Sequence, residues 1–520
     1  MKRDEQINFL KASNNYDVII IGGGASALGS AVESSTRGFK TILFEAKDFA
    51  NSTSSRSTKL VHGGFRYLRQ GNIALVREAL LERSILQKNA NHLVNKQQFV
   101  IPVYNYFSSI IIFFGLVLYD LLSGKNSFGR TKFISVKNIV ELIPPINKNK
   151  LKGGIIYYDG QFDDARLAIN LAQTAINYGA VVLNYFKVID ILKADGKISG
   201  VIVQDQISNE VFKVFSRVVI NATGIFAGEI IKLDDLNANK FLVPSQGIHL
   251  VFDKIFLPIK SALMIPKTSD GRVLFVIPWR ESIIAGTTDT IVENISFEPI
   301  ATVEEINFII NSLQKYFSIK IKKENIKSVF AGLRPLISDG KSKSTKDISR
   351  SHKIIISNSG LITIVGGKWT TFRKMGEDVL DKAIQFHNLE KRKSVSKNIS
   401  IHGNKIFRTN EPSTHLNFYG TDKENILKLI KNSPALAEKI HTDFEFTIAE
   451  VIWAIREEMG VNIDDILARR VRLLFLNSIV AMESAEKIAN ILASELNWSE
   501  EKRTIEINNF KKIASTFILT

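Results

Sequence analysis

The hydrophobic and polar positions near the N-terminus have the order of a strand, a helix and a second strand. Residues 18–21 form a short β-branched run that predicts a buried strand. Residues 25–37 have the pattern of a helix, and Gly38 supplies its end. Another apolar run follows at 41–44. The pattern therefore predicts a βαβ unit, the usual building block of a parallel sheet.

The turn between the first strand and the helix has the spacing G-x-G-x-x-A. Glycines let the backbone approach a pyrophosphate, and the helix N-terminus places partial positive charge beside it. Glu45 ends the second strand, where a carboxylate can accept hydrogen bonds from the ribose of an adenosine. The residues predicted to bind a dinucleotide here are Gly22, Gly23, Gly24, Ala25 and Glu45.

Two later segments repeat the order of apolar strand and glycine turn. Residues 217–224 read RVVINATG, and residues 361–371 read LITIVGGKWTT before a helix that runs to Phe386. Strands so far apart in sequence can lie beside the first βαβ unit only if the intervening chain forms inserted modules. We therefore expect an α/β fold with a discontinuous Rossmann-like cofactor-binding domain.

The intervening and C-terminal segments have different patterns. Residues 241–335 contain short strand-like runs that predict a β-rich substrate domain, whereas residues after about 400 form amphipathic helices. We predict an oxidoreductase region at 1–395 and an all-α C-terminal domain at 396–520. Within the first, we expect cofactor-binding segments at about 16–75, 150–232 and 350–390, and substrate-domain segments at about 76–149 and 233–349.

The most apolar stretch, at 108–124, has an uninterrupted apolar core only from Ile110 to Tyr119. A membrane-spanning helix needs about 20 such residues, so no segment is expected to cross a bilayer. A helix that is apolar all round is either buried in the core or dipped into a membrane surface. Of these two, burial is favoured. The N-terminus has no apolar core or cleavage site, so no signal peptide is expected.

The amino-acid composition excludes several kinds of functional site and favours certain partners. The chain has no cysteine, which excludes disulfides, thiolate metal sites, iron–sulfur clusters and a cysteine nucleophile; no metal site is expected. Its net charge of +16 favours anionic partners such as phosphorylated metabolites or acidic lipid headgroups. There is no dense basic block with interleaved aromatic residues, so nucleic acid is not an expected partner.

A hydroxyl-rich segment at 46–71 follows Glu45, where the rest of a long cofactor would lie. A Ser/Thr cluster is more often a solvated loop, but its position favours a role in the site. Asp163 and Asp164, further along, are interpreted as caps at the start of a helix. The remaining predicted cofactor-binding residues are Ser54, Ser55, Thr58, Lys59, His62, Gly63, Gly64, Thr223, Gly224, Gly366, Gly367, Lys368, Trp369 and Thr370.

Together these motifs favour FAD over NAD, because the additional turns suit an extended flavin cofactor. The segments YDVIIIGGGASALGSA, SSRSTKLVHGGFRYLRQG, VVINATG, GIHLVF, AGLRPL and VGGKWTTFRKM occur in the order of the FAD-dependent glycerol-3-phosphate dehydrogenases, and the chain resembles that family over nearly its whole length. The resemblance implies a non-covalent FAD and oxidation of sn-glycerol 3-phosphate to dihydroxyacetone phosphate. It also implies a role in glycerol metabolism, with electrons passed to a membrane quinone.

The resemblance also implies roles for individual residues. His249 matches the family's proposed base, and Arg66, Arg334 and Lys368 match its cationic substrate-site residues, with Tyr67 beside the first. Arginine suits phosphate oxygens geometrically, and imidazole, with a pKa of about 6.5, suits proton transfer. Three positions depart from the family pattern: Ala27, Gln246 and Trp369.

Two other functions stay open. The same half-reaction with oxygen as acceptor would make the chain a glycerol-3-phosphate oxidase, and a flavin-binding protein without turnover is the third interpretation. The expected location is cytoplasmic, peripheral on the inner face of the cytoplasmic membrane, with contact to anionic lipid and a homodimer left open.

Overall fold

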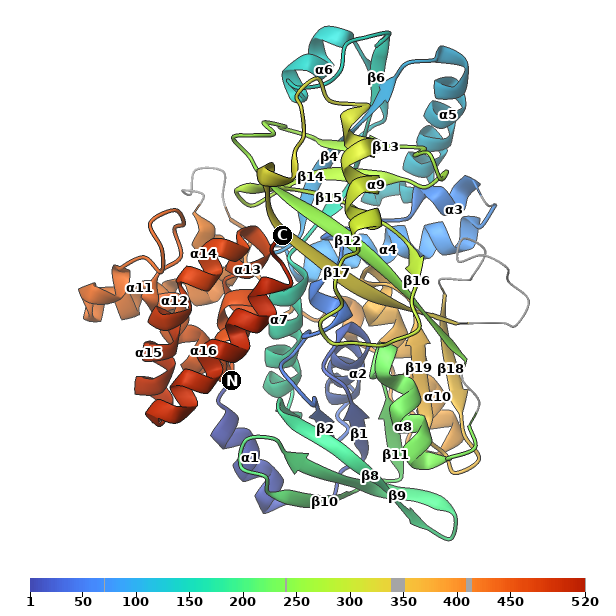
Figure 1. The fold of residues 1–520 in the computed structure, drawn as a ribbon. Coiled ribbons are helices and arrows are strands. Elements are labelled where there is room, and N and C mark those ends of the chain that lie inside the picture. The colour runs from blue at the N-terminus through green and yellow to red at the C-terminus, as the bar shows by residue number, and fades with distance from the viewer. Residues whose placement is uncertain (70, 239–240, 338–350, 408–413, 520) are drawn as a thin grey trace.

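A computed structural model describes residues 1–69, 71–238, 241–337, 351–407 and 414–519 (Figure 1). Positions 338–350, where two of the predicted domain segments meet, lie outside the described residues. The first sheet has six strands in the order β18-β19-β11-β1-β2-β7. Their bounds are β1 Val18–Ile21, β2 Thr41–Phe44, β7 Val181–Leu183, β11 Val218–Asn221, β18 His352–Ile356 and β19 Ile362–Gly366.

The strands that carry the three glycine turns are neighbours in this sheet. Val18 pairs with both Val218 and Thr41, and all of these strands run parallel. Asn221 on β11 pairs with Thr363 on β19, again in parallel. The three turns therefore end at one edge of the sheet, as the sequence pattern predicted.

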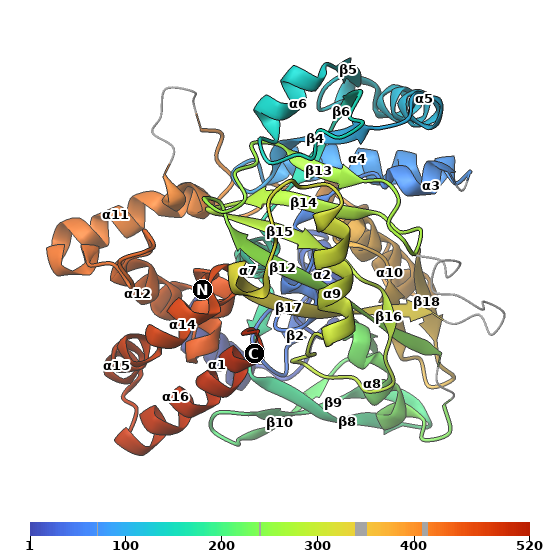
Figure 2. The ribbon, with the colours of Figure 1, turned by 45° about the horizontal axis from the view of Figure 1, so that its top comes forward.

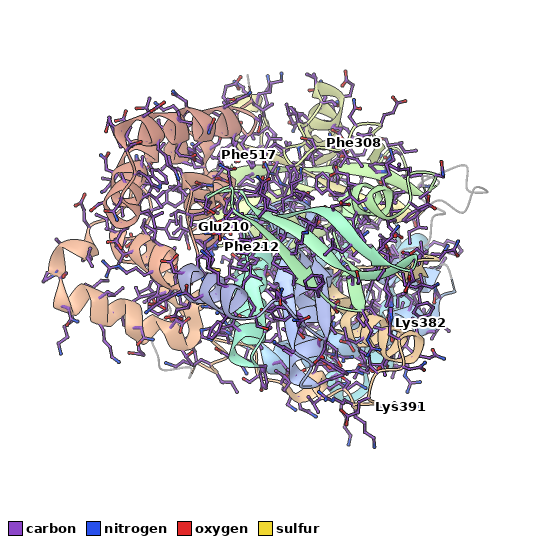
Figure 3. The ribbon with its side chains drawn as sticks, turned by 90° about the horizontal axis from the view of Figure 1, so that it is seen from below. Glu210, Phe212, Phe308, Lys382, Lys391 and Phe517 are labelled. Atoms are coloured by element: carbon purple, nitrogen blue, oxygen red, sulfur yellow. The ribbon has the colours of Figure 1, made fainter. Side chains whose placement is uncertain are left out.

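Helices α2 (Ala25–Thr36), α7 (Asp164–Asn177) and α10 (Phe372–Phe386) share one apolar core with this sheet. The backbones of α2 and α10 come very close, because a Cβ at Gly376 would lie 2.6 Å from the carbonyl oxygen of Gly29. A three-stranded sheet of β8 (Phe186–Ala194), β9 (Lys197–Asp205) and β10 (Val211–Phe215) packs through a second core that includes Ile19 and Ile21. Figure 3 shows this sheet from below, with Phe212 on β10 labelled.

The second large sheet has ten strands and forms the upper half of the molecule in Figures 1 and 2. Its two longest strands are β12 (Leu242–Asp253) and β17 (Ile326–Ile337), which pair antiparallel so that His249 lies opposite Phe330. The other strands are β3 Leu60–Val61, β4 Asn95–Val103, β5 Lys132–Ile134, β6 Gly153–Gln161, β13 Ala262–Ile265, β14 Leu274–Trp279, β15 Ser282–Gly286 and β16 Thr290–Ile291.

The C-terminal helices gather on one side of both sheets (Figure 1). They are α11 Lys423–Asn432, α12 Ile448–Glu457, α13 Leu473–Leu476, α14 Ser478–Glu483, α15 Ala485–Leu496 and α16 Glu500–Ser515. Their apolar core continues into the second sheet through Val251 and Phe330. The remaining helices are α1 Arg3–Ala12, α3 Phe65–Arg69, α4 Ile73–Asn89, α5 Tyr106–Ser123, α6 Val136–Leu142, α8 Ala227–Asp234 and α9 Val303–Gln314.

The prediction that the apolar stretch at 110–119 is buried is wrong. It forms the middle of α5, where Leu116 and Tyr119 face the protein but Ile111 and Phe114 are each 66% exposed. An 18-residue window, Ser109–Asn126, has a mean hydropathy of 1.3, so by length and composition this helix could cross a membrane. The ten-residue apolar core in the sequence did not distinguish a helix packed on all sides from one packed on one side.

Candidate active site

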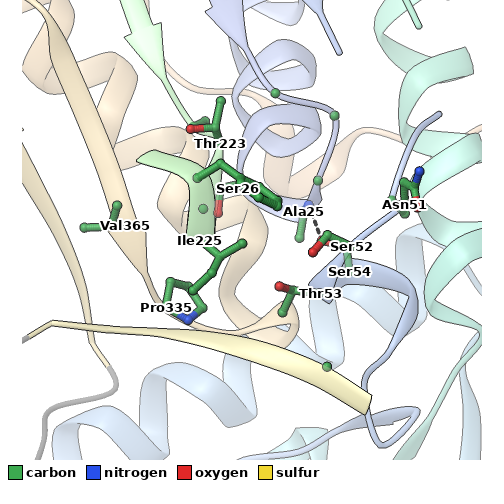
Figure 4. Close-up of a pocket in the computed structure, with 18 of the residues that line it drawn as sticks. Ala25, Ser26, Asn51, Ser52, Thr53, Ser54, Thr223, Ile225, Pro335 and Val365 are labelled. Carbon is green, nitrogen blue, oxygen red and sulfur yellow. Dashed lines mark hydrogen bonds between the residues drawn. The ribbon is translucent and has the colours of Figure 1, made fainter. Parts of the chain in front are cut away.

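One cavity of about 720 Å³ lies where the three glycine turns meet the second sheet. Its wall includes Gly22, Thr223 and Gly367 from the turns, and His249 and Arg334 from β12 and β17. This is the edge of a parallel sheet at which α/β proteins bind ligands. Figure 4 shows Thr223, Val365 and Pro335 around the same space.

The first turn is built for a close backbone approach. Gly22 has a φ of +116°, and a Cβ there would lie 2.8 Å from the carbonyl oxygen of Ala222. At Gly24 a Cβ would come within 2.9 Å of the Ser54 hydroxyl, which accepts a 3.0 Å hydrogen bond from the backbone N–H of Ala25 (Figure 4). The turn thus leaves the N-terminus of α2 facing the cavity, where it favours negative charge.

Glu45 lies beside this turn at the end of β2, and its carboxylate accepts a 2.8 Å hydrogen bond from the backbone N–H of Lys47. Burial raises the pKa of Glu45 to about 7. A buried carboxylate is stabilised by hydroxyl donors that replace the water it has lost. A ribose supplies two such hydroxyl groups.

The hydroxyl-rich segment joins the turns to one another rather than forming a solvated loop. Trp369 donates from its indole nitrogen to the carbonyl oxygen of Ser54 at 2.9 Å, and Thr53 donates to the carbonyl oxygen of Leu333 at 2.7 Å. The backbone N–H of His62 donates to Thr370 at 3.2 Å. The segment therefore forms a wall common to both sheets.

His249 on β12 faces this wall. Its Nε2 and the Thr58 hydroxyl form a 2.9 Å hydrogen bond, and its ring stacks on Phe330 with 4.8 Å between centroids. No described residue hydrogen-bonds to its Nδ1. The pKa of His249 is held well below 6.5, first by burial and then by the positive charges of Lys59 and Arg334. The imidazole is therefore neutral at physiological pH and can accept a proton.

The residues that directly follow β15 hold the guanidinium of Arg334, which lies on β17. Its guanidinium donates to the Thr287 hydroxyl at 3.1 Å and to the carbonyl oxygen of Thr288 at 3.2 Å, and it lies 3.6 Å from the Asp289 carboxylate. Gly247 packs against the same group, because a Cβ there would collide with it. The orientation of the cation is therefore set before any ligand arrives.

Lys368 adds a second positive charge to the cavity wall. Its ammonium lies 3.8 Å from the centroid of the Tyr67 ring, and both residues line the cavity. The side chain of Arg66, the third predicted cation, lies outside the described part of the structure.

Most of the predicted cofactor-binding residues line this cavity, and four do not. Ser55, Lys59, Gly63 and Gly64 are the four that are not among the lining residues. Lys59 is fully buried, and its amine pairs with Asp164 at 2.6 Å. Two of the three positions that depart from the family pattern also differ in location: Trp369 lines the cavity, whereas Gln246 is buried outside its lining and donates to Glu305 at 2.7 Å.

Two residues of the site were not predicted from the sequence. Asp289, which pairs with Arg334, is the acid in the IIAGTTD run, and Arg56 lines the cavity while pairing with Glu298. Arg56 stands in the segment SSRSTKLVHGGFRYLRQG of the family pattern, so its position in the sequence could have indicated a role in the site. The partners of both residues, however, are distant in sequence, Arg334 on β17 and Glu298 in the loop before α9, so these pairs could be identified only in the fold.

The cavity fits an extended flavin dinucleotide. A volume of about 720 Å³ is in the range of cofactor pockets. The close-approach glycines and Glu45 are the groups that a pyrophosphate and a ribose require, and they lie at one end. The other walls bring together His249, Arg334 and Lys368, which are suited to a small anionic substrate.

Comparison with known families agrees with this site. Residues 17–373 match the family described as FAD dependent oxidoreductase, and residues 362–503 match the C-terminal domain of alpha-glycerophosphate oxidase. The mitochondrial glycerol-3-phosphate dehydrogenase of Bos taurus is 38% identical over 98% of this chain and 74% of its own length. The SDP6 glycerol-3-phosphate dehydrogenase of Arabidopsis thaliana is 34% identical over 97% of this chain and 87% of its own length.

A solved structure gives the same result in three dimensions. The glycerol-3-phosphate dehydrogenase from Bacillus halodurans, complexed with FAD, has a TM-score of 0.81 and 27% identity, and the match covers 99% of this chain and 98% of that one. The L-alpha-glycerophosphate oxidase of Mycoplasma pneumoniae, at 18% identity and a TM-score of 0.54, shares the fold. By its sequence matches, its fold and its cofactor cavity, the chain belongs to the family of FAD-dependent glycerol-3-phosphate dehydrogenases.

Proposed function

We propose that this protein oxidises sn-glycerol 3-phosphate to dihydroxyacetone phosphate and passes the electrons to a membrane quinone. The observation that carries the proposal is the single cavity in which three glycine turns meet a neutral histidine and two cations. Oxidation of a secondary alcohol needs a proton acceptor for the hydroxyl and a hydride acceptor for the carbon. Bound FAD supplies the hydride acceptor, its N5 atom.

The residues of the chain supply the rest of the chemistry. Arg334 and Lys368 bind the phosphate dianion, the first as a planar fork and the second as a point charge. Their position fixes the distance from the phosphate to the C2 hydroxyl, and so selects a three-carbon ester. Tyr67, which lines the cavity beside Lys368, completes this subsite.

His249 accepts the hydroxyl proton. We assign the lone pair to Nε2, because Thr58 hydrogen-bonds to that nitrogen and itself lines the cavity, so a substrate hydroxyl that reaches Thr58 also reaches Nε2. Burial and the adjacent cations keep the ring neutral before the reaction. As the C2 hydrogen leaves as hydride, the O–H bond breaks and the carbonyl of dihydroxyacetone phosphate forms.

Helix α5 supports the quinone part of the proposal. Its outer face is apolar, with Phe107 80% exposed and Phe114 66% exposed, and Phe133 extends it by stacking on Phe113 at 4.3 Å. Exposed Lys125, Arg130 and Lys132 follow directly. An apolar helix face with a basic rim is typical of proteins seated on anionic membranes. Because Leu116 and Tyr119 hold the other face of the helix on the protein, we place α5 along the surface.

Replacing apolar residues on the exposed face of α5 by charged ones should weaken binding of the protein to membranes. We expect the Phe107→Glu, Phe114→Glu double variant to lose at least tenfold in affinity for vesicles of one part phosphatidylglycerol to three of phosphatidylcholine, measured by co-sedimentation. Flavin reduction by glycerol 3-phosphate should stay normal. Leu236→Glu changes an exposed apolar residue that follows α8 instead of lying on α5, and as the control it should bind as wild type does. If the double variant binds vesicles as well as wild type does, α5 is not the membrane-binding helix.

Anaerobic reduction of the bound flavin tests the function itself. Glycerol 3-phosphate should bleach the flavin absorbance, whereas glycerol, glycerol 2-phosphate and glycerate should not do so at the same concentration. A flavin that no polyol phosphate bleaches would indicate a binding protein without turnover. Rapid turnover with a water-soluble quinone, without peroxide in air, distinguishes the dehydrogenase from the oxidase. Peroxide released at the rate of turnover would reject the quinone as acceptor.

A further inference from the structure

A buried cluster of charges lies behind the cavity wall, between Thr58 and the C-terminal helices. At its centre is Asp164, the first residue of α7. One of its oxygens accepts hydrogen bonds from the backbone N–H of Ser57 at 3.1 Å, the Ser57 hydroxyl at 2.7 Å and the Lys59 amine at 2.6 Å. Both neighbours of Thr58 are therefore fixed on one carboxylate.

Asp164 is not needed to cap its own helix. The N-cap of α7 is Asp163, which accepts a 3.0 Å hydrogen bond from the backbone N–H of Arg166. Both aspartates were predicted to stabilise the start of this helix, Asp163 is its N-cap, and Asp164 lies in the first turn, where its Oδ1 accepts a 2.9 Å hydrogen bond from the backbone N–H of Ala165. The other oxygen of Asp164 binds the segment that carries Thr58.

The side chain of Arg472, from the C-terminal helical region, contacts the same charge cluster around Asp164. It precedes α13, is fully buried and has a left-handed backbone with a φ of +70°. Its guanidinium donates to the carbonyl oxygen of Ser55 at 2.9 Å and to Asp164 at 3.1 Å, while Lys59 donates to the same Ser55 carbonyl at 2.6 Å. The segment from Ser55 to Lys59 is thus held from two elements that are far apart in sequence.

Stability gives little reason to bury such a cluster. Buried ion pairs recover little more than their own desolvation cost, and apolar replacements are often neutral or stabilising. What the cluster does fix is geometry: Thr58 lies between two anchored residues, and its hydroxyl meets His249 at 2.9 Å. Lys59 also contacts the ring of Phe330, on which His249 stacks.

We propose that Asp164 and Arg472 are positioning residues that hold Thr58 against His249, so that the C-terminal helices complete the active site. The proposal rests on the proposed function, because it gives His249 the role of base. It predicts that disturbing the cluster slows proton removal while leaving the phosphate subsite intact.

Four variants of the holoenzyme test this, with flavin reduction followed anaerobically at increasing glycerol 3-phosphate. In Arg472→Lys and Asp164→Asn, we expect the limiting rate constant for reduction to fall about tenfold or more. The apparent dissociation constant for glycerol 3-phosphate should stay within about twofold of wild type, and FAD should remain bound. The third variant, Ser57→Ala, leaves every buried charge paired. A slower rate in this variant is therefore not explained by misfolding around an unpaired charge. It should slow reduction severalfold, and Ser57→Thr should restore the rate.

Arg166→Lys is the matched control, since Arg166 is a buried arginine whose guanidinium pairs with Glu458 across the same interface and bonds to the Arg470 carbonyl oxygen, not to the Asp164 carboxylate. It should lower the melting temperature but reduce flavin at the wild-type rate. Wild-type reduction rates in Arg472→Lys and Ser57→Ala would overturn the proposal, as would an equal slowing in Arg166→Lys. If His249→Ala reduces flavin normally, the proposed function loses its base. Slow reduction in that variant, with normal rates in the cluster variants, rejects this inference alone.

Discussion

Replacing His249 by alanine should leave FAD bound and slow its reduction by glycerol 3-phosphate by roughly 10²- to 10⁴-fold. The neutral ring is the base of the proposed reaction, and its pKa is held low by burial, Lys59 and Arg334. Alanine removes the proton acceptor but leaves the glycine turns and Glu45 as they are. Stopped-flow absorbance of the flavin under anaerobic conditions measures the effect.

The control for this variant is His441→Ala, which removes a histidine of the C-terminal helical region whose Nε2 lies 3.5 Å from the Glu483 carboxylate. It should reduce flavin at the wild-type rate. The FAD content of both variants, read from the visible spectrum, separates loss of base from loss of cofactor. An unchanged reduction rate in His249→Ala would remove His249 from the mechanism.

Replacing Arg334 by glutamine should weaken binding of glycerol 3-phosphate by roughly 30- to 1000-fold, equivalent to about 2 to 4 kcal/mol. The guanidinium is oriented by Thr287, Thr288 and Asp289, so it meets the phosphate without reorganisation. The effect should be specific to the phosphate: slow oxidation of glycerol at high concentration should change little. Steady-state kinetics with both substrates measure this difference.

The same variant carries a second expectation about pH. The positive charge of Arg334 lowers the pKa of His249, so its loss must raise that pKa. The acid limb of flavin reduction should therefore move to higher pH in Arg334→Gln. Arg456→Gln, which breaks a surface pair with Glu495, is the matched control and should change neither affinity nor pH profile. Unaltered affinity in Arg334→Gln would refute its role at the phosphate.

The glycine turns could be predicted because their signal is local. Gly22, Gly24 and Glu45 stand at fixed spacing within one βαβ unit, and the structure places them as that spacing requires. The adjacency of the turns at Thr223 and Gly367 also followed from pattern, since buried parallel strands that end in glycine belong to one sheet edge.

The local sequence pattern did not predict where the side chain of Lys59 lies. In sequence it is a polar residue beside Thr58 in a hydroxyl-rich segment, and we predicted that it binds the cofactor. Its left-handed backbone instead directs the amine away from the cavity to Asp164. Helix α5 failed for a similar reason, because its composition did not tell which of its faces the rest of the protein would cover.

The sequence by itself thus determined the fold class, the cofactor and the residue types of the site, because strand period, glycine spacing and family motifs are properties of short stretches of chain. Tertiary structure alone decided which charges face the cavity and which are buried behind it. That choice depends on contacts between residues hundreds of positions apart, such as Arg472 with Ser55. Such contacts exist only once both sheets and the C-terminal helices have packed together.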